Sequence, residues 1–280
     1  MEESRQFRLD FYLLIPYYNN LPGLIRSLKS ISYDPVKYAL LIVDDGSKDI
    51  LRYEDLVPHI PGALPVKIIR LPENKGITKA LNTGLQWLEE NSNFRYVARL
   101  DCGDVCAESR FRQQVSFLDQ HPDIDLVGSW CVFKDFSTGF SYRYITPTEH
   151  EKITRGMYFR NIFIHPTVMW RVGVAGKAGI YPEIFPHAED YGFFYEILNS
   201  GKGAILPEYL VTCEINPKGI SLFFRKEQLK SRARVVKLYG KSRVLSLMGV
   251  IKLWFLMVIP YGWVLSIKKR VYGIKRISVN

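Results

Sequence analysis

The sequence predicts an α/β protein whose mostly parallel sheet is flanked by helices, followed by a basic and apolar helical tail. Through residues 1–135, short apolar runs rich in β-branched side chains alternate with amphipathic stretches, a pattern typical of strands joined by crossover helices. The length of 280 residues suits one large domain or a domain with an appendage. The net positive charge lies near the end of the chain, where it surrounds an apolar run.

Four short apolar runs predict buried strands, and two stretches between them have the spacing of amphipathic helices. The strands are expected at residues 11–15, 39–43, 66–71 and 96–100, and the helices at residues 21–30 and 77–89. In the second helix Ile77, Leu81 and Leu85 recur on one face. A further helix is expected at residues 110–120, ended by Pro122, and a strand at residues 124–133.

Polar side chains follow three of these strands, at the point where each strand ends. They lie in residues 16–19, 44–47 and 101–104. Parallel strands end at the same edge of a sheet, and ligands bind at that edge in folds of this class. After the remaining strand, residues 73–76 begin a helix whose backbone amides could face an anion. We therefore expect a ligand site at this edge.

Asp101 and Asp104 suit a hard divalent cation such as Mg²⁺ or Mn²⁺, which usually takes one or two protein carboxylates together with substrate phosphates. Such a cation would neutralise a diphosphate leaving group. Ordinary turn chemistry is the alternative, since Asp and Gly end strands in many proteins. Tyr18 could likewise stack on a base or pack against the sheet, and the residues alone leave both alternatives open.

A second acidic cluster, Glu189-Asp190, opens an apolar helical stretch at residues 191–198. Acids at a helix N-terminus are stabilised by the helix dipole, which is one explanation of the cluster. A carboxylate there could instead act as a general base. Upstream, His165 precedes a proline and is either a loop residue or part of the wall of a site.

The net charge of +10 divides sharply at residue 216. Residues 216–280 hold 15 Lys and Arg and one acid, whereas the rest of the chain has a net charge of −4. Within this tail, residues 253–267 form a charge-free run that is short for a spanning helix, although residues 244–267 would suffice if Lys252 reached the interface. We expect the tail to associate with an anionic membrane surface, lying in its plane or re-entering it. A core helix with a solvated basic face is the alternative.

Other classes of protein are disfavoured. Four cysteines exclude a disulfide-dense secreted scaffold, and their spacing does not suit a zinc site. The polar, acidic N-terminus lacks a secretory signal, so we expect the catalytic part to stay in the cytoplasm with reduced thiols. The acidic part of the chain offers no basic groove, so no nucleic-acid partner is expected.

Taken together and in this order, the motifs resemble those of family 2 glycosyltransferases, which are inverting enzymes of the GT-A fold. The likeness covers residues 8–215 and is carried by Pro16-x-Tyr18-Asn19, Asp44-Asp45-Gly46-Ser47, Glu73-Asn74-Lys75-Gly76, Arg99-Leu100-Asp101, Arg110 with Gln113, Asp123-Ile124-Asp125, His165-Pro166-Thr167 and Ala188-Glu189-Asp190-Tyr191. Each motif is weak alone, but the ordered set is specific. It implies a Rossmann-like, nucleotide-binding GT-A catalytic domain at residues 1–215, and a membrane-associating helical segment at residues 216–280.

The resemblance implies transfer of a sugar from a nucleotide-sugar donor, UDP-linked, to an acceptor hydroxyl by single displacement with inversion. It assigns Asp190 as the base that takes the acceptor proton, and Glu189 as the residue that orients the base or the acceptor. Donor contacts are implied for Pro16, Tyr18, Asn19, Asp44, Asp45, Asn74, Gly76, Lys79 and Asp101, metal contacts for Asp101 and Asp104, and acceptor-side positions for His165 and Arg171. With the tail, it points to a lipid-linked, lipopolysaccharide or capsule glycan acceptor at the cytoplasmic face of a bacterial inner membrane.

Two departures from the family pattern bear on the metal. The family commonly reads Asp-x-Asp-Asp at the fourth strand, whereas this chain has Gly103 in the third place. Many relatives also carry a His after the last core strand, and residues 214–221 have none.

Two alternative functions remain. A nucleotidyltransferase would want a Gly-rich basic loop that residues 17–20 do not supply, and Gly103 leaves room for a non-catalytic donor-binding relative.

Overall fold

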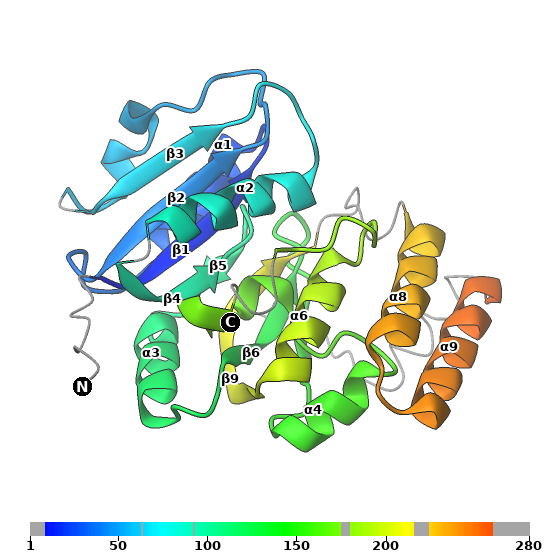
Figure 1. The fold of residues 1–280 in the computed structure, drawn as a ribbon. Helices are drawn as coiled ribbons and strands as arrows, with labels where there is room; N and C mark the ends of the chain where they lie inside the picture. Colours follow the sequence, from blue (N-terminus) through cyan, green and yellow to red (C-terminus); the bar gives the residue numbers. More distant parts are fainter. Residues whose placement is uncertain (1–8, 63, 92, 175–179, 216–223, 260–280) are drawn as a thin grey trace.

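The computed structural model describes residues 9–62, 64–91, 93–174, 180–215 and 224–259 (Figure 1). Its strands are β1 (Leu9–Tyr17), β2 (Tyr38–Asp44), β3 (Val66–Arg70), β4 (Phe94–Arg99), β5 (Val105–Cys106), β6 (Leu126–Lys134), β7 (Ser141–Tyr144), β8 (Met169–Arg171) and β9 (Gly203–Glu214). They form one nine-stranded sheet in the order β3-β2-β1-β4-β8-β6-β9-β5, with β7 paired to β6. The predicted α/β fold is therefore confirmed.

The half of the sheet that carries the predicted site is parallel. β1 pairs in parallel with β2 and β4, and β2 pairs in parallel with β3. β8 runs antiparallel between β4 and β6, and β9 returns parallel to β6. All seven residues of β2 are buried, which agrees with a continuous apolar run covered on both faces. The carboxyl ends of β1, β2, β3 and β4 consequently lie at one edge.

Helices cover both faces of this sheet (Figure 1). The described helices include α1 (Leu21–Lys29), α2 (Ile77–Glu90), α3 (Arg110–Gln120), α4 (His150–Met157), α6 (Glu189–Ser200), α8 (Arg225–Tyr239) and α9 (Arg243–Val258), with short 3-10 turns η1 (Tyr53–Asp55), η2 (Val57–His59) and η3 (His165–Thr167). Of these, α8 packs on α6, and α9 packs on α8. Apolar residues of α1 and α3 pack in one cluster, and those of α2, α4, α6, α8 and α9 pack in the other. The predicted helices at 21–30, 77–89, 110–120 and 191–198 are all present.

The two C-terminal helices are packed on the rest of the molecule. Leu229 and Val236 of α8, and Val250 and Leu253 of α9, are buried in the cluster that contains α6. Within the described ranges, none of the helices combines the length and apolarity that a bilayer crossing needs. The charge-free run at residues 253–267 continues beyond residue 259, outside the described residues. The division of the chain at residue 216 stays a prediction.

Candidate active site

Asp45, which follows β2, is bonded to the loop that leads into α2. Its two carboxylate oxygens accept hydrogen bonds from the backbone N–H of Lys75, at 2.8 Å, and of Gly76, at 2.9 Å. Burial raises the pKa of Asp45 in spite of these two bonds. The two amides at the start of α2 thus face a carboxylate of the protein itself, and the pair joins the end of β2 to the predicted donor loop.

Asp44 is fully buried at the last position of β2. Its Oδ1 accepts from the Ser47 backbone N–H at 2.9 Å, and its Oδ2 accepts from Arg70 Nη1 at 3.1 Å. Arg70, the last residue of β3, also donates to the Ser47 carbonyl at 2.7 Å. Asp44 therefore shapes the turn at residues 44–47, on which the predicted donor contacts depend.

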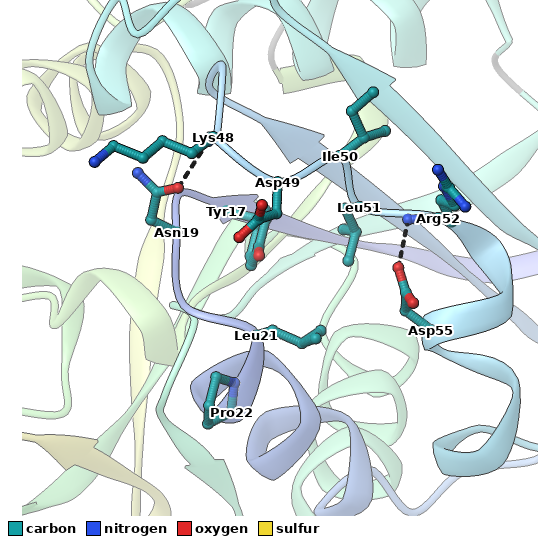
Figure 2. A pocket seen from close by; sticks show the side chains of 10 residues that line it. All are labelled: Tyr17, Asn19, Leu21, Pro22, Lys48, Asp49, Ile50, Leu51, Arg52 and Asp55. Carbon is teal, nitrogen blue, oxygen red and sulfur yellow. Dashed lines mark hydrogen bonds between the residues drawn. The ribbon is translucent and has the colours of Figure 1, made fainter.

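Tyr18 and Asn19 directly follow β1. Tyr18 is 47% exposed, whereas Tyr17 is buried in the cluster beneath α1. Asn19 has a positive φ of 48°, and its Oδ1 accepts from the Lys48 backbone N–H at 2.8 Å. Figure 2 shows this bond at the rim of a pocket of about 770 Å³, lined by Tyr17, Asn19, Leu21, Pro22, Lys48, Asp49, Ile50, Leu51, Arg52 and Asp55. This pocket contains one predicted donor residue, Asn19, and none of the predicted catalytic acids.

The remaining predicted donor residues line the same edge. Pro16 is partly buried in β1, and Asn74 is exposed in the loop after β3. Gly76 has a φ of 86°, which a residue with a side chain rarely adopts, and directly precedes α2. Lys79, on the first turn of α2, forms an exposed contact of 3.6 Å with Glu183. Of these residues, Asn74 and Lys79 have side chains that are exposed to solvent.

Arg99, at the end of β4, is the centre of the buried polar network. The side chain is completely buried, donates to the carbonyls of Leu14 and Leu100 at 3.0 Å each, and forms a close ion pair with Asp101. Its Nε donates to His165 Nε2 at 3.3 Å. Burial would raise the pKa of Asp101, but the charge of Arg99, its hydrogen bond to Asp101 and the charge of Arg110 act together in the opposite direction and hold the pKa below its ordinary value. Asp101 is therefore ionised at neutral pH.

His165 is a neutral part of this network. Burial, followed by the charge of Arg99, lowers the pKa of His165 to about 3. Because an arginine can only donate, Nε2 of His165 must accept, so its proton is on Nδ1 and the Tyr181 hydroxyl donates to Nε2 at 2.9 Å. Asn82 of α2 holds Tyr181 through two backbone hydrogen bonds of 2.9 Å. The predicted acceptor-side residue His165 thus connects β4 to the segment before α6.

Asp104 is buried beside Asp101. Its Oδ1 accepts from the Glu214 backbone N–H at 2.7 Å, which ties the turn after β4 to the end of β9. Burial, and then the negative charge of Asp101, raise the pKa of Asp104 well above its ordinary value. The two carboxylates therefore repel each other.

A cation would relieve this repulsion. In the described part of the chain, no three carboxylate, imidazole or thiol groups gather into a protein-only metal site. Asp101 and Asp104 nevertheless fit a cation that takes two protein carboxylates and completes its shell with donor phosphates, as Mg²⁺ usually does.

Glu189 and Asp190 begin α6, as the acidic motif predicts. Asp190 Oδ2 accepts from Asn161 Nδ2 at 2.8 Å, and Oδ1 accepts from the Tyr191 backbone N–H at 2.7 Å. Burial raises the pKa of Asp190, and burial followed by the charge of Asp190 raises the pKa of Glu189 to about 7. Oε2 of Glu189 is buried and has no hydrogen-bond partner among the residues that the structure describes. The His165 ring, bonded to Arg99 at the end of β4, also lies against Phe194 of α6 with centroids 5.8 Å apart, so the two elements border one site. The charge of Asp101 contributes to both shifts.

Arg171 lies apart from this site. Its guanidinium donates to the carbonyls of Leu118, His121 and Ile124, where it joins β8 to the end of α3. The geometry therefore gives Arg171 a structural contact, whereas it brings Asp101, His165, Glu189 and Asp190 together.

Sequence reasoning gave no role in the site to several residues that build it, including Arg99, which it named only as part of a motif. Arg99 carries a signal, because it is a charged residue inside an otherwise apolar strand. Asn82 carries a weaker one, as an amide on the buried face of α2. No local signal points to Asn161, Tyr181 or Arg232, since their contacts with the site depend on how distant elements pack.

A mostly parallel sheet with acidic residues at the ends of β2 and β4 and at the start of α6 is the arrangement expected of a nucleotide-sugar-dependent glycosyltransferase of the GT-A type. The model of the family described as Glycosyl transferase family 2 matches residues 12–185. This chain belongs to glycosyltransferase family 2, whose members are inverting enzymes of class EC 2.4.

Relatives named for polysaccharide synthesis are among the proteins it resembles. An uncharacterized glycosyltransferase of Haemophilus influenzae is 30% identical over 75% of each chain. The amylovoran biosynthesis glycosyltransferase AmsE of Erwinia amylovora is 29% identical over 72% of this chain and 74% of its own. A UDP-Gal:alpha-D-GlcNAc-diphosphoundecaprenol beta-1,3-galactosyltransferase of Escherichia coli is 24% identical over 76% of this chain and 72% of its own.

Solved structures share the fold. S. aureus TarS 1-349 in complex with UDP-GlcNAc superposes with a TM-score of 0.64 at 16% identity, covering 88% of this chain and 72% of TarS 1-349. The mannosyltransferase PcManGT of Pyrobaculum calidifontis, in complex with GDP-Man and Mn²⁺, gives a TM-score of 0.63 at 16% identity, covering 99% of this chain and 77% of its own.

Proposed function

We propose that the protein transfers a sugar from a UDP-linked donor to a hydroxyl of a lipid-linked, lipopolysaccharide or capsule glycan, with Asp190 as the general base. The observation that carries the proposal is the position of Asp190, half-buried at the start of α6 and fixed by Asn161, facing the acids at the end of β4. The relatives named for amylovoran synthesis and for a diphosphoundecaprenol acceptor support a glycan acceptor on a lipid carrier.

In the proposed reaction, the acceptor oxygen attacks the anomeric carbon while its proton moves to Asp190. The carbon–oxygen bond to the diphosphate breaks on the opposite side, and UDP leaves with both electrons of that bond. Glu189 orients the base or the acceptor, and Tyr18 stacks on the uracil beside the turn that Asp44 and Asp45 hold. A divalent cation, Mg²⁺ or Mn²⁺, would be held by Asp101 and Asp104 and would neutralise charge on the diphosphate.

Asp190→Asn tests the base. The variant keeps the shape and the Asn161 contact, so we expect the Kd for UDP to change less than about twofold while turnover falls by about 10² to 10⁴. Calorimetry measures UDP binding, and UDP release measures turnover with donors chosen by thermal shift, with and without Mn²⁺. The control is Asp123→Asn, which changes an exposed acid paired with Lys202 and should leave both UDP binding and turnover unchanged. Wild-type turnover in Asp190→Asn would remove this residue from the mechanism.

The anionic membrane surface is the proposed partner of the C-terminal helices, at the cytoplasmic face of the inner membrane. Seven large apolar side chains between 51% and 82% exposed lie on the face of α9 opposite Gly249, Val250 and Leu253, which pack inward. They are Val244, Leu247, Met248, Ile251, Trp254, Phe255 and Val258. An apolar helix face within a basic segment is typical of a helix that lies in the interface.

Vesicle binding tests this partner. The triple variant Leu247→Gln, Ile251→Gln, Phe255→Gln should lose cosedimentation with vesicles of phosphatidylcholine and phosphatidylglycerol and keep its melting temperature, because all three side chains are exposed. The control triple Lys226→Gln, Lys230→Gln, Lys237→Gln removes exposed charges from α8 and should weaken binding chiefly at low salt. If the native protein stays in the supernatant with these vesicles, the membrane proposal fails.

A further inference from the structure

One face of α8 is turned toward the start of α6, and the two helices pack side by side (Figure 1). Phe224, Gln228 and Arg232 are spaced four residues apart at and beyond the beginning of α8, so they share this face. Phe224 stacks on the His187 ring, with centroids 4.4 Å apart and planes at 9°. Gln228 Nε2 donates to the His187 carbonyl at 3.0 Å.

His187 is the residue at which the chain turns into the acidic motif. Its φ of 62° lies in the left-handed region, which a residue with a side chain adopts only when its surroundings hold it there. Glu227 of α8 adds a contact of 3.6 Å to the imidazole. Glu189 and Asp190 follow His187 by two and three residues. The contacts of Phe224, Gln228 and Glu227 with His187 therefore fix the backbone from which the two carboxylates extend.

Arg232 is the next residue on the same face, one turn beyond Gln228. Its Nε is buried and has no hydrogen-bond partner within the described ranges. Its charge lowers the pKa of both Asp190 and Tyr191, although the described residues include no direct ion pair between Arg232 and Asp190. A guanidinium in this position acts on the carboxylate without occupying its oxygens.

Two acids also lie near Asp190 in the described part of the chain. Asp101 faces it from the end of β4, and Glu189 precedes it on α6. Asn161 and the Tyr191 backbone N–H contribute hydrogen bonds, and the Tyr181 hydroxyl lies nearby without charge. Among the influences on the pKa of Asp190, the charge of Arg232 is the largest one that opposes burial and the charge of Asp101.

We propose that Arg232 is a positioning residue for Asp190. It lies on the same face of α8 as Phe224 and Gln228, which contact His187, and this face places its charge beside the base. The fixed positive charge keeps the Asp190 carboxylate ionised while the acceptor hydroxyl approaches. The inference rests on the proposed function, and it gives part of the basic C-terminal segment a role in the reaction rather than at the membrane.

The test compares Arg232→Gln with Arg232→Lys, which keeps the charge, and with Lys230→Gln, which removes an exposed charge two residues away on the same helix. Carboxyl ¹³C NMR, with the Asp190 signal assigned from Asp190→Asn, gives the pKa of Asp190 directly. We expect Arg232→Gln to raise this pKa by half a unit or more, and Arg232→Lys and Lys230→Gln to leave it within experimental error. UDP binding by calorimetry should be unchanged in all three.

The pH profile of UDP-galactose and UDP-GlcNAc turnover gives the second measurement. Removal of the charge makes Asp190 easier to protonate, so the acidic limb of the profile should move to higher pH in Arg232→Gln and return in Arg232→Lys. An unchanged NMR pKa of Asp190 in a folded Arg232→Gln would overturn the inference. A raised KM for the acceptor, with the acidic limb of the pH profile unshifted, would also overturn it, because Arg232 would then be a contact of the acceptor. Turnover that survives Asp190→Asn would instead overturn the proposed base, whatever Arg232 does.

Discussion

The carboxylate of Glu214 lies in the space that a side chain at position 103 would occupy. A Cβ built on Gly103 would stand 2.3 Å from Glu214 Oε2, closer than two such atoms can approach. Arg26 of α1 holds both partners, with Nη2 2.7 Å from Glu214 Oε1 and Nε donating to the Gly103 carbonyl at 3.0 Å. The glycine that departs from the family pattern is therefore matched to a carboxylate on β9 and to an arginine on α1.

Gly103→Ala should destabilise the protein by about 1–3 kcal/mol through its backbone alone, because the φ of 112° is unfavourable for any residue with a Cβ. Displacement of Glu214 from Arg26 should add up to about 1 kcal/mol, since both side chains are about one-third exposed. Urea denaturation measures the sum.

Gly139→Ala separates the two contributions. Gly139 has a φ of 73° and no atom within 4 Å of its Cβ position, so its substitution reports backbone strain without the clash. Adding Glu214→Ala to Gly103→Ala should remove the clash and leave the backbone cost, so the double variant should be more stable than Gly103→Ala. A double variant no more stable than Gly103→Ala would show that Glu214 does not oppose a side chain at this position.

Arg99→Met should cost about 3 kcal/mol or more. It leaves Asp101 without its cation, removes the arginine donor from the buried Leu100 carbonyl, and leaves the Leu14 carbonyl with only the Leu100 N–H among the described donors. Arg95→Met provides the contrast, because Arg95 pairs with Asp10 and Asp119 while partly exposed, and its loss should cost about 1 kcal/mol or less. Equal losses in the two variants would mean that Arg99 is not the centre of a buried network.

The strands and helices of the nucleotide-binding half were predictable because each shows its own periodicity. β2 is an uninterrupted apolar run, and Ile77, Leu81 and Leu85 mark the inner face of α2. The grouping of Asp101 with Glu189 and Asp190 followed from family likeness, since no local pattern connects β4 to α6. The role of α8 was not predictable in this way. Its basic composition favoured a membrane surface, and only its packing against α6 reveals the Gln228–His187 hydrogen bond.

Tyr18→Ala should weaken UDP binding by about 10- to 100-fold, the usual effect of removing an aromatic ring on which a base stacks. The ring is 47% exposed after β1, so its removal should leave the melting temperature unchanged. Tyr18→Phe keeps the ring and should bind UDP as the native protein does. Calorimetry checks both, and an unchanged Kd in Tyr18→Ala would mean that the base binds elsewhere.

Glu189 should make the stability of the protein depend on pH. Burial, and then the charge of Asp190, raise the pKa of Glu189 from 4.5 to about 7, so the folded protein favours the protonated carboxyl. Its contribution is therefore fully present below pH 4.5 and is lost as the pH rises through 7. A shift of this size corresponds to about 3 kcal/mol.

Glu189→Gln has no such proton to lose. It should match the native protein at pH 4 and exceed its free energy of unfolding by up to about 3 kcal/mol at pH 8, as measured by urea denaturation at both values. Glu73→Gln, an exposed acid, should show no difference at either pH. If the gain in Glu189→Gln were the same at pH 4 and pH 8, titration of Glu189 would not be its source, because its pKa would then be the same in the folded and the unfolded protein.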